Sequence, residues 1–238
     1  MEIILSAQDV VKGFQKGEVI LKGITLEIKK GDFTVILGPS GSGKSTLLSV
    51  LSGMIKPDSG QVFYQNSNQN SNQNISNASE KELARWRRNE ISSIFQDYLL
   101  LRNLTVRENI EIGKSPDTDP IPIHQLTEIL GIEDIMTKFP SQLSGGQQQR
   151  AAIARAVIKR PQILFCDEAT GALDESNSKR VVGLLHDLKK KFGITVLFVT
   201  HNLQIAETAD RIITVKDGRI HQDYRNENPI EADDMVWG

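Results

Sequence analysis

Segments typical of buried strands alternate with helical patterns along this chain, which predicts an α/β fold built on a mostly parallel sheet. Residues 33–37, 162–166 and 195–200 form short, almost continuously apolar runs, as expected of strands that are buried on both faces. A helical pattern at about residues 176–191 separates the last two runs. Strands joined by such helical crossovers lie parallel in one sheet.

The other elements follow from local patterns. Residues 21–28 alternate between apolar and polar, which predicts a strand, and residues 91–96 predict another. Ser79 and Glu82 fit a capping box, so we expect a helix from there to about residue 88. Helical patterns dominate residues 97–150, which indicates a helical insertion between strands.

Two polar segments lack an apolar pattern. Within residues 66–74, the tetrapeptide Ser-Asn-Gln-Asn at 67–70 is repeated at 71–74. This segment has nothing to bury, so we expect a solvated loop lengthened by duplication rather than a functional Asn/Gln motif. The tail, residues 225–238, is also polar, and we expect it to be loosely held.

Composition narrows the class of protein. The chain has 238 residues, of which 39% are hydrophobic and 24% charged, which suits a folded domain. The net charge of −2 and the lack of a long basic run argue against nucleic-acid binding. Cys166 is the only cysteine, so no intrachain disulfide can form and a cytoplasmic location is expected. The N-terminus lacks a secretion signal, and the longest apolar runs, about six residues, are far shorter than the ~20 that span a bilayer. We therefore expect a soluble protein whose membrane role depends on a partner.

A phosphate-binding pattern, G-x-x-x-x-G-K-S/T, lies between a predicted strand and a helix expected at residues 45–51. Its glycines leave backbone N–H groups free to wrap phosphate oxygens, and the helix N-terminus adds positive potential. Lys44 is expected to reach the β- and γ-phosphates, and the Ser45 hydroxyl to bind Mg²⁺. A chance glycine-rich turn is the alternative, which the strand-before-helix context disfavours. The pattern consists of Gly38, Pro39, Ser40, Gly41, Ser42, Gly43, Lys44, Ser45 and Thr46.

Two adjacent carboxylates follow a second buried strand. Asp167 is placed to hold Mg²⁺, directly or through water, and Glu168 to polarise a water molecule against the γ-phosphate. Adjacent acids can merely begin a loop, but together with the phosphate loop they indicate a phosphate-loop ATPase or GTPase.

A third motif narrows the class further. Residues 143–147, Leu-Ser-Gly-Gly-Gln, resemble the signature motif of ABC ATPases, and the motif order from about residue 5 to 218 fits that family. The resemblance implies a RecA-like P-loop core with an antiparallel β-subdomain (residues 1–96 and 155–224) and an inserted α-helical subdomain (97–154), all in one ABC ATPase domain. A helix cap with flexible glycines is the plainer alternative.

The resemblance also assigns roles to residues. It implies that Ser144, Gly145, Gly146 and Gln147 contact the γ-phosphate of ATP held by a second copy of the chain.

By the same resemblance, Gln96 senses Mg²⁺ and nucleotide, Asp174 belongs to a loop that passes between the two copies, and His201 contacts the γ-phosphate. Phe14 resembles the aromatic residue that stacks on adenine, where the family more often has tyrosine; an ordinary core phenylalanine remains the alternative. Glu168, His201, Gln96 and Lys44 are thus the expected catalytic residues.

Residues 38–48, 95–100, 143–155 and 165–174 look most like the branch that contains macrolide-efflux, lipoprotein-release and antimicrobial-peptide exporters, which pair with FtsX-like permeases. The resemblance implies a cassette at the cytoplasmic face of the cell membrane that dimerises head-to-tail around two ATP molecules. It would drive a separate permease that exports peptides, lipids or antibiotics. Ala169 replaces the usual proline, and residues 109–141 are shorter than usual, which bears on how the permease is gripped.

Two alternatives remain. A non-transport ABC ATPase acting as a soluble mechanical switch typically carries two cassettes or a long coiled coil, and this chain has one cassette and no sustained heptads. A regulatory module that binds ATP without hydrolysing it would not need Glu168 and His201.

Overall fold

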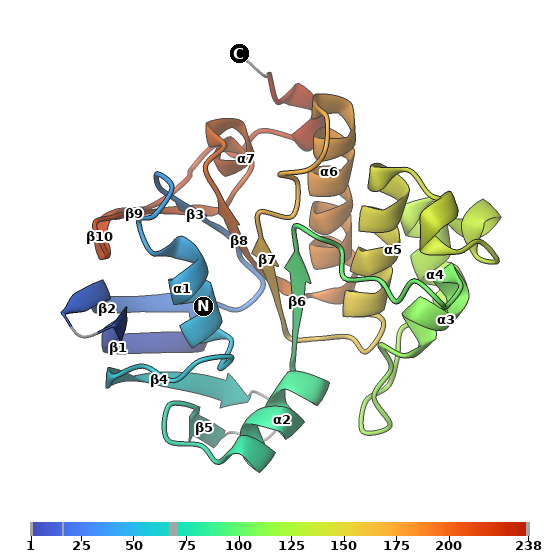
Figure 1. The fold of residues 1–238 in the computed structure, drawn as a ribbon. Helices are drawn as coiled ribbons and strands as arrows, with labels where there is room; N and C mark the ends of the chain where they lie inside the picture. Colours follow the sequence, from blue (N-terminus) through green and yellow to red (C-terminus); the bar gives the residue numbers. More distant parts are fainter. Residues whose placement is uncertain (1, 16, 67–70, 237–238) are drawn as a thin grey trace.

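The computed structural model describes residues 2–15, 17–66 and 71–236, which form two sheets flanked by helices (Figure 1). The larger sheet has the strand order β10-β9-β3-β8-β7-β6. Its strands β3, β6, β7, β8 and β9 run parallel, and β10 is antiparallel to β9. The predicted α/β class with a mostly parallel sheet is confirmed. The strand bounds are β3 Phe33–Leu37, β6 Ile91–Phe95, β7 Ile163–Asp167, β8 Thr195–Thr200, β9 Arg211–Lys216 and β10 Arg219–Arg225.

The smaller sheet is antiparallel and has the order β2-β1-β4-β5. Its strands are β1 Ile3–Gln15, β2 Glu18–Lys29, β4 Ser59–Asn66 and β5 Ser71–Asn74. Burial alternates along the second half of β2, because one face of this sheet packs on the core and the other faces solvent.

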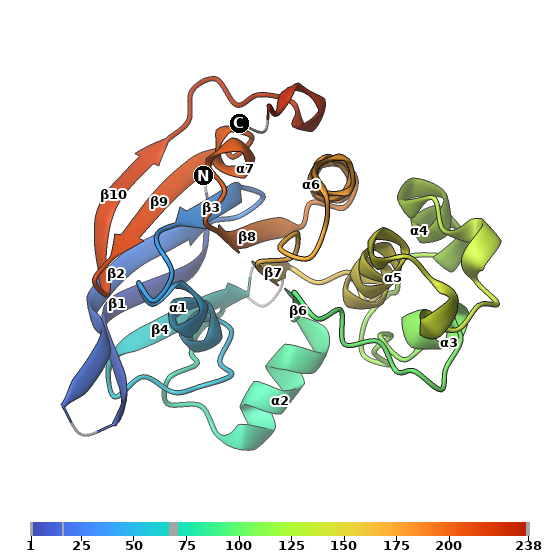
Figure 2. The same cartoon turned by 45° about the horizontal axis from the view of Figure 1, so that its top comes forward.

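Helices cover both faces of the larger sheet (Figures 1 and 2). α2 begins with the predicted capping box, in which Ser79 N donates to Glu82 Oε2 at 2.8 Å. None of the helices among the described residues is long and apolar enough to cross a bilayer. The helix bounds are α1 Lys44–Leu51, α2 Glu80–Asn89, α3 Val106–Glu111, α4 Ile123–Leu130, α5 Gly145–Val157, α6 Glu175–Phe192 and α7 Leu203–Glu207. Short 3₁₀ turns are η1 Glu133–Ile135, η2 Pro140–Gln142 and η3 Ala232–Asp234.

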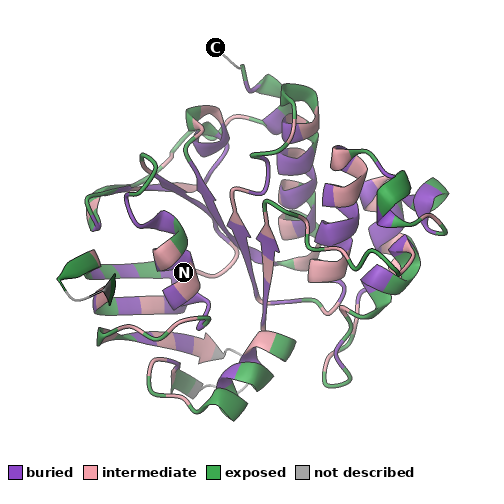
Figure 3. Cartoon of the chain, in the orientation of Figure 1, coloured by how far each residue is buried: buried purple, intermediate pink, exposed green. Residues whose placement is uncertain are grey.

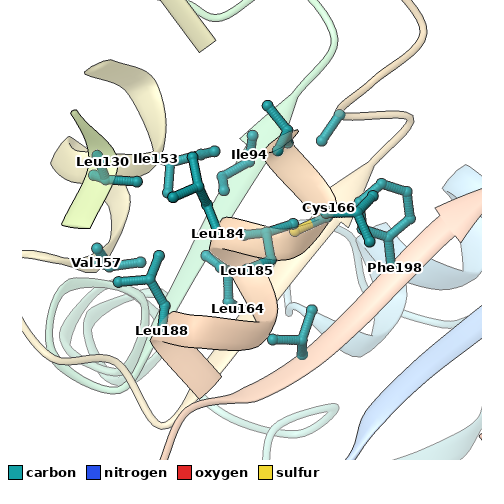
Figure 4. Close-up of a cluster of buried hydrophobic side chains, with 14 of the residues drawn as sticks. Ile94, Leu130, Ile153, Val157, Leu164, Cys166, Leu184, Leu185, Leu188 and Phe198 are labelled. Carbon is teal, nitrogen blue, oxygen red and sulfur yellow. The ribbon is translucent and has the colours of Figure 1, made fainter. Parts of the chain in front are cut away.

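The larger sheet separates two hydrophobic cores, and Figure 3 shows its central strands β3, β8 and β7 buried almost throughout. On one face, Leu184, Leu185 and Leu188 of α6 meet the sheet and the helices α4 and α5 (Figure 4). On the other face, α1 and the smaller sheet pack together. The strands of the larger sheet are therefore fixed from both sides, which holds the loops at their ends in place.

The expectation that residues 66–74 form only a solvated loop is wrong for part of that segment. Residues 71–74 form β5, which pairs antiparallel with β4, so that Gln73 lies opposite Tyr64. Asn72 and Gln73 are exposed, because this edge strand is held by backbone hydrogen bonds rather than by burial of its side chains. Residues 67–70, the first copy of the repeat, lie outside the described residues.

The expectation of a loosely held tail is also wrong for residues 225–236, whereas residues 237–238 lie outside the described residues. β10 extends to Arg225, and the chain beyond it returns to the body of the protein, where η3 packs against α6. Met235 is 0% exposed and Ala232 is buried, both within the core that contains α6. The N–H of Ile230 donates to Glu207 O at 3.1 Å. Two apolar side chains suffice to anchor a segment that is otherwise polar.

Candidate functional site

Residues of the candidate site come together because four parallel strands end at one edge of the larger sheet. Leu37 lies opposite Thr200, and Asp167 lies opposite both Val199 and Phe95. The residues that follow these strands, including Gly38, Glu168 and His201, therefore start from the same edge. In open α/β sheets this carboxyl edge is where ligands bind.

The loop after β3 needs glycine for steric reasons. A Cβ atom on Gly38 would lie 2.2 Å from the backbone oxygen of Val215, closer than atoms can approach. Gly41 and Gly43 have φ angles of 77° and 100°, in the left-handed region that favours glycine. The loop then enters α1 at Lys44, so backbone N–H groups at the helix N-terminus face the concavity of the loop.

Lys44 and Ser42 show that this loop suits an anion. Lys44 is 5% exposed, and its Nζ donates to Gly38 O at 2.8 Å and to Pro39 O at 2.9 Å. Among the described residues, no carboxylate forms an ion pair with this buried ammonium. The buried Ser42 Oγ has no hydrogen-bond partner there either. A phosphate group would supply the missing charge and acceptors.

Ser45 and Asp167 offer oxygen ligands beside the loop. Ser45 Oγ donates to Asp167 Oδ1 at 2.9 Å. Burial raises the pKa of Asp167 above its ordinary value; the Ser45 hydrogen bond opposes this rise and the Glu168 charge adds to it. No group of three or more His, Cys, Asp or Glu side chains gathers within the described ranges. A hydroxyl and one carboxylate nevertheless suit Mg²⁺, which takes its other ligands from phosphates and water.

Glu168 adopts an uncommon backbone conformation, with φ at 45°. Its N–H donates to Val199 O at 3.0 Å, which ties the residue to β8. Its Oε1 lies 3.3 Å from Nδ1 of His201, whose side chain is 67% exposed. The backbone turn thus directs the carboxylate toward His201 and away from the continuation of β7.

Gln96 lies in the same pocket. A cavity of about 410 Å³ is bordered by residues from β6, α1 and β7 and the loops after the two strands. The Gln96 amide lies against Gly171, since a Cβ there would be 3.2 Å from Gln96 Nε2. The residues that border the cavity are Ser45, Phe95, Gln96, Asp97, Leu99, Asp167 and Glu168.

The signature residues lie elsewhere. Ser144 caps α5 in a capping box with Gln147, at 3.3 Å from Gln147 N to Ser144 Oγ. In Figures 1 and 2, α5 and α1 lie on opposite sides of β6 and β7. Within one chain the structure therefore does not bring Ser144–Gln147 to the phosphate loop.

The start of α6 packs against the signature glycines. Asp174 caps this helix, accepting from Asn177 N at 2.8 Å. The same Asp174 side chain also accepts two hydrogen bonds from Asn177 Nδ2, at 3.1 and 2.9 Å. A Cβ on Gly146 would lie 2.4 Å from the Asn177 Oδ1 held in this way. Asp174 and Gly146 thus belong to one local cluster.

Phe14 is 62% exposed near the tip of the β1–β2 hairpin, so it is not the core phenylalanine that was the alternative. Lys12 Nζ lies 5.8 Å from its ring centroid. Asp58 accepts from Lys12 Nζ and from Gly13 N, both at 2.7 Å, and so braces the backbone next to Phe14. Sequence reasoning missed this brace, because Asp58 lies 44 residues away from Phe14 and belongs to no recognisable motif.

Comparisons with known proteins agree on one family. The family model described as ABC transporter matches residues 21–171. A putative ABC transporter ATP-binding protein of Mycoplasma pneumoniae is 43% identical over 99% of this chain, which spans only 51% of that protein. The macrolide export ATP-binding/permease protein MacB of Marinobacter nauticus is 40% identical over 95% of this chain, which spans 35% of it.

Two further proteins align with this chain over most of the length of both chains. The bacitracin export ATP-binding protein BceA of Halalkalibacterium halodurans is 41% identical over 92% of this chain and 87% of that protein. A solved dimeric post-hydrolysis structure of the cassette MJ0796, bound to ADP and phosphate, superposes with a TM-score of 0.81 at 34% identity, over 94% of this chain and all of that one. The resemblance to exporter cassettes is thereby confirmed, and this chain belongs to the ABC transporter family as one of its ATP-binding cassettes.

Proposed function

We propose that this chain hydrolyses ATP to drive export by a membrane permease. One observation carries the proposal: the loop around the buried Lys44, the Ser45–Asp167 pair and the Glu168–His201 pair share one edge of the larger sheet. A phosphate-binding loop next to a metal-ligand pair and a base is the arrangement that phosphoryl transfer to water requires.

Each residue has a separate task at the triphosphate. Lys44 exchanges its bonds to the Gly38 and Pro39 carbonyls for the β- and γ-phosphates, and the loop N–H groups bind the remaining oxygens. Ser45, Asp167 and Gln96 would hold Mg²⁺, and the ion would supply positive charge that neutralises the phosphates. Phe14, exposed near its hairpin tip, stacks on the adenine.

Glu168 and His201 orient the water molecule that reacts. Glu168 accepts a hydrogen bond from the water and takes its proton as the water oxygen bonds to the γ-phosphorus. The bond from that phosphorus to the β–γ bridging oxygen breaks at the same time, so that ADP and phosphate are the products. His201, 3.3 Å from the Glu168 carboxylate, donates to the γ-phosphate and holds Glu168 in place.

A second copy of the chain supplies further hydrogen-bond donors to the γ-phosphate. Ser144, Gly145, Gly146 and Gln147 begin a 13-residue helix whose N-terminal N–H groups favour an anion, yet they lie away from their own phosphate loop. Two copies placed head-to-tail would bring each signature to the other copy's ATP, with Asp174 at the contact. The dimeric cassette structure with 34% identity supports this arrangement.

The partner and location follow from the relatives. Two of the relatives are named as ATP-binding proteins of export systems, and one of these, MacB, is named as an ATP-binding protein and permease in one chain. We infer that this chain works peripherally at the cytoplasmic face of the cell membrane with an FtsX-like permease that exports peptides, lipids or antibiotics. Residues 97–154 are the unit that we expect to move when ATP closes the dimer.

A dimer-trapping experiment tests the composite site. Glu168→Gln should bind ATP without hydrolysing it, so ATP should shift this variant from monomer to dimer in size-exclusion chromatography with light scattering. Adding Ser144→Arg should prevent the dimer, because a bulky cation would enter the interface, while ATP binding to the monomer persists. Ser79→Arg, at the cap of α2, is the matched control, since Ser79 also caps a helix but lies outside the proposed interface. ATP-dependent dimerisation of the Ser144→Arg double variant would contradict the composite site.

A further inference from the structure

The loop that follows Gln96 is strained at two successive residues. Tyr98 and Leu99 have φ angles of 56° and 50°, although neither is glycine. Left-handed backbone at a bulky residue costs about 1 kcal/mol or more and persists only where neighbouring groups enforce it. Something must therefore hold this loop against its local preference.

Arg155, on the last full turn of α5, is the group that holds it. Its Nη1 donates to Leu99 O at 2.7 Å and its Nη2 donates to Tyr98 O at 3.0 Å. The two nitrogens of one planar guanidinium thus bind the carbonyls of both strained residues. This fork geometry is available to arginine and not to lysine, which offers a single ammonium.

The loop is attached to α5 at a second point. The Tyr98 hydroxyl lies beside Gly145, where a Cβ would approach it to 3.0 Å. Gly145 is the first residue of α5 and Arg155 is ten residues further on, a separation of about 15 Å along the helix axis. Tyr98 thus contacts α5 twice: its hydroxyl lies beside the start of the helix, and its carbonyl oxygen accepts from the guanidinium of Arg155.

We propose that Arg155 is a positioning residue that locks the loop after Gln96 to α5, so that the Gln96 amide and the signature residues move as one body. This inference rests on the proposed function, because it assumes that Gln96 meets Mg²⁺ and nucleotide. Gln96 is only two residues before Tyr98, so the carbonyls that Arg155 holds set the position of its side chain against Gly171.

The lock has a consequence for hydrolysis. When the signature of one copy closes on the ATP of its partner, α5 carries the Tyr98–Leu99 turn with it, and Gln96 shifts in its own pocket. Without Arg155 the strained turn relaxes, and Gln96 no longer follows α5. The phosphate loop does not touch Arg155, so ATP binding to the monomer stays as it was.

Steady-state ATPase kinetics and nucleotide binding of the full chain test whether Arg155 positions the loop after Gln96. Arg155→Met keeps the length of the side chain but removes both donors, and kcat should fall roughly tenfold while the Kd for ATP changes less than about threefold. Arg155→Lys should recover part of kcat, because an ammonium can reach one carbonyl. Lys159→Met is the matched control: Lys159 lies four residues further along the chain, just beyond the end of α5, is half-buried, and donates to the Arg87 carbonyl at 2.7 Å. Its kcat should stay within about twofold of that of the parent.

A double-mutant cycle separates positioning from general destabilisation. If Arg155 acts through Gln96, adding Arg155→Met to Gln96→Ala should lower kcat little beyond the single Gln96 variant. Multiplying effects, or an equal loss of kcat in Lys159→Met, would overturn the proposal. If Arg155→Met fails to fold, the same cycle made with Arg155→Lys and Gln96→Ala decides it. An inactive parent chain with Mg²⁺ and ATP would instead refute the proposed function.

Discussion

Met235 allows a quantitative prediction about stability, because it is a buried residue in an otherwise polar tail. Its side chain is 0% exposed and belongs to the core around α6. Met235→Ala removes three non-hydrogen atoms at about 0.8 kcal/mol each, and the cavity left behind adds to this loss. We expect the free energy of unfolding to fall by about 2–4 kcal/mol, which in a chain of this length lowers Tm by about 5–12 °C.

Thermal denaturation followed by circular dichroism measures this loss, and urea titration checks that the m-value is unchanged. Val236→Ala is the neighbouring control, because Val236 is 70% exposed and should change stability by less than about 0.5 kcal/mol. ATPase activity at 25 °C should be retained in both variants, since the tail packs on α6 away from the phosphate loop. A Tm within about 2 °C of the parent for Met235→Ala would mean that the tail does not dock in solution.

Two further predictions follow from the site and the repeat. Burial raises the pKa of Asp167, so its charged form is disfavoured in the folded state. Asp167→Asn should therefore raise Tm at pH 7, and it should abolish Mg²⁺-dependent hydrolysis. This gain should shrink as pH falls and vanish below the ordinary carboxyl value of 3.8, because Asp167 is then protonated in both states; a lower Tm at pH 7 would contradict the prediction. Deleting residues 71–74 should change Tm and ATPase activity little, because the identical tetrapeptide 67–70 then directly precedes Ile75 and can pair with β4 in place of β5. A large fall in Tm would show that the repeat supports more than one edge strand.

The sequence predicted those parts of the fold that depend on local pattern. The apolar runs of β3, β7 and β8 identified strands buried on both faces, and all three are central in the sheet. Ser79 and Glu82 form the capping box that their spacing indicates, with Ser79 Oγ accepting from Glu82 N at 3.4 Å. In each case the signal lies within a few residues and the structure adds no competing interaction.

Features that depend on long-range contacts could not be predicted. Asn72 and Gln73 have side chains of low β-propensity, yet they lie in a strand because β4 offers an open edge. Met235 is buried only because α6 and the core beneath it present a matching surface more than forty residues earlier in the chain. Burial of a single apolar residue in a polar segment leaves no periodic pattern to detect.

In the candidate site, too, local motifs predict some features, and others depend on long-range contacts. Motifs identify Lys44, Asp167 and Glu168 because phosphate chemistry requires those side chains at those strand ends. No motif predicts that Glu168 lies at a φ of 45°, or that Arg155 holds two left-handed carbonyls. Both are backbone conformations that cost energy locally and are stabilised by another element, β8 in the first case and α5 in the second. Positive φ angles also occur at Asp9, Arg160 and Asp217, away from the site, so strain alone does not mark a functional residue. The strain at Glu168 and at Tyr98–Leu99 bears on function because these residues adjoin the candidate phosphate site and Gln96.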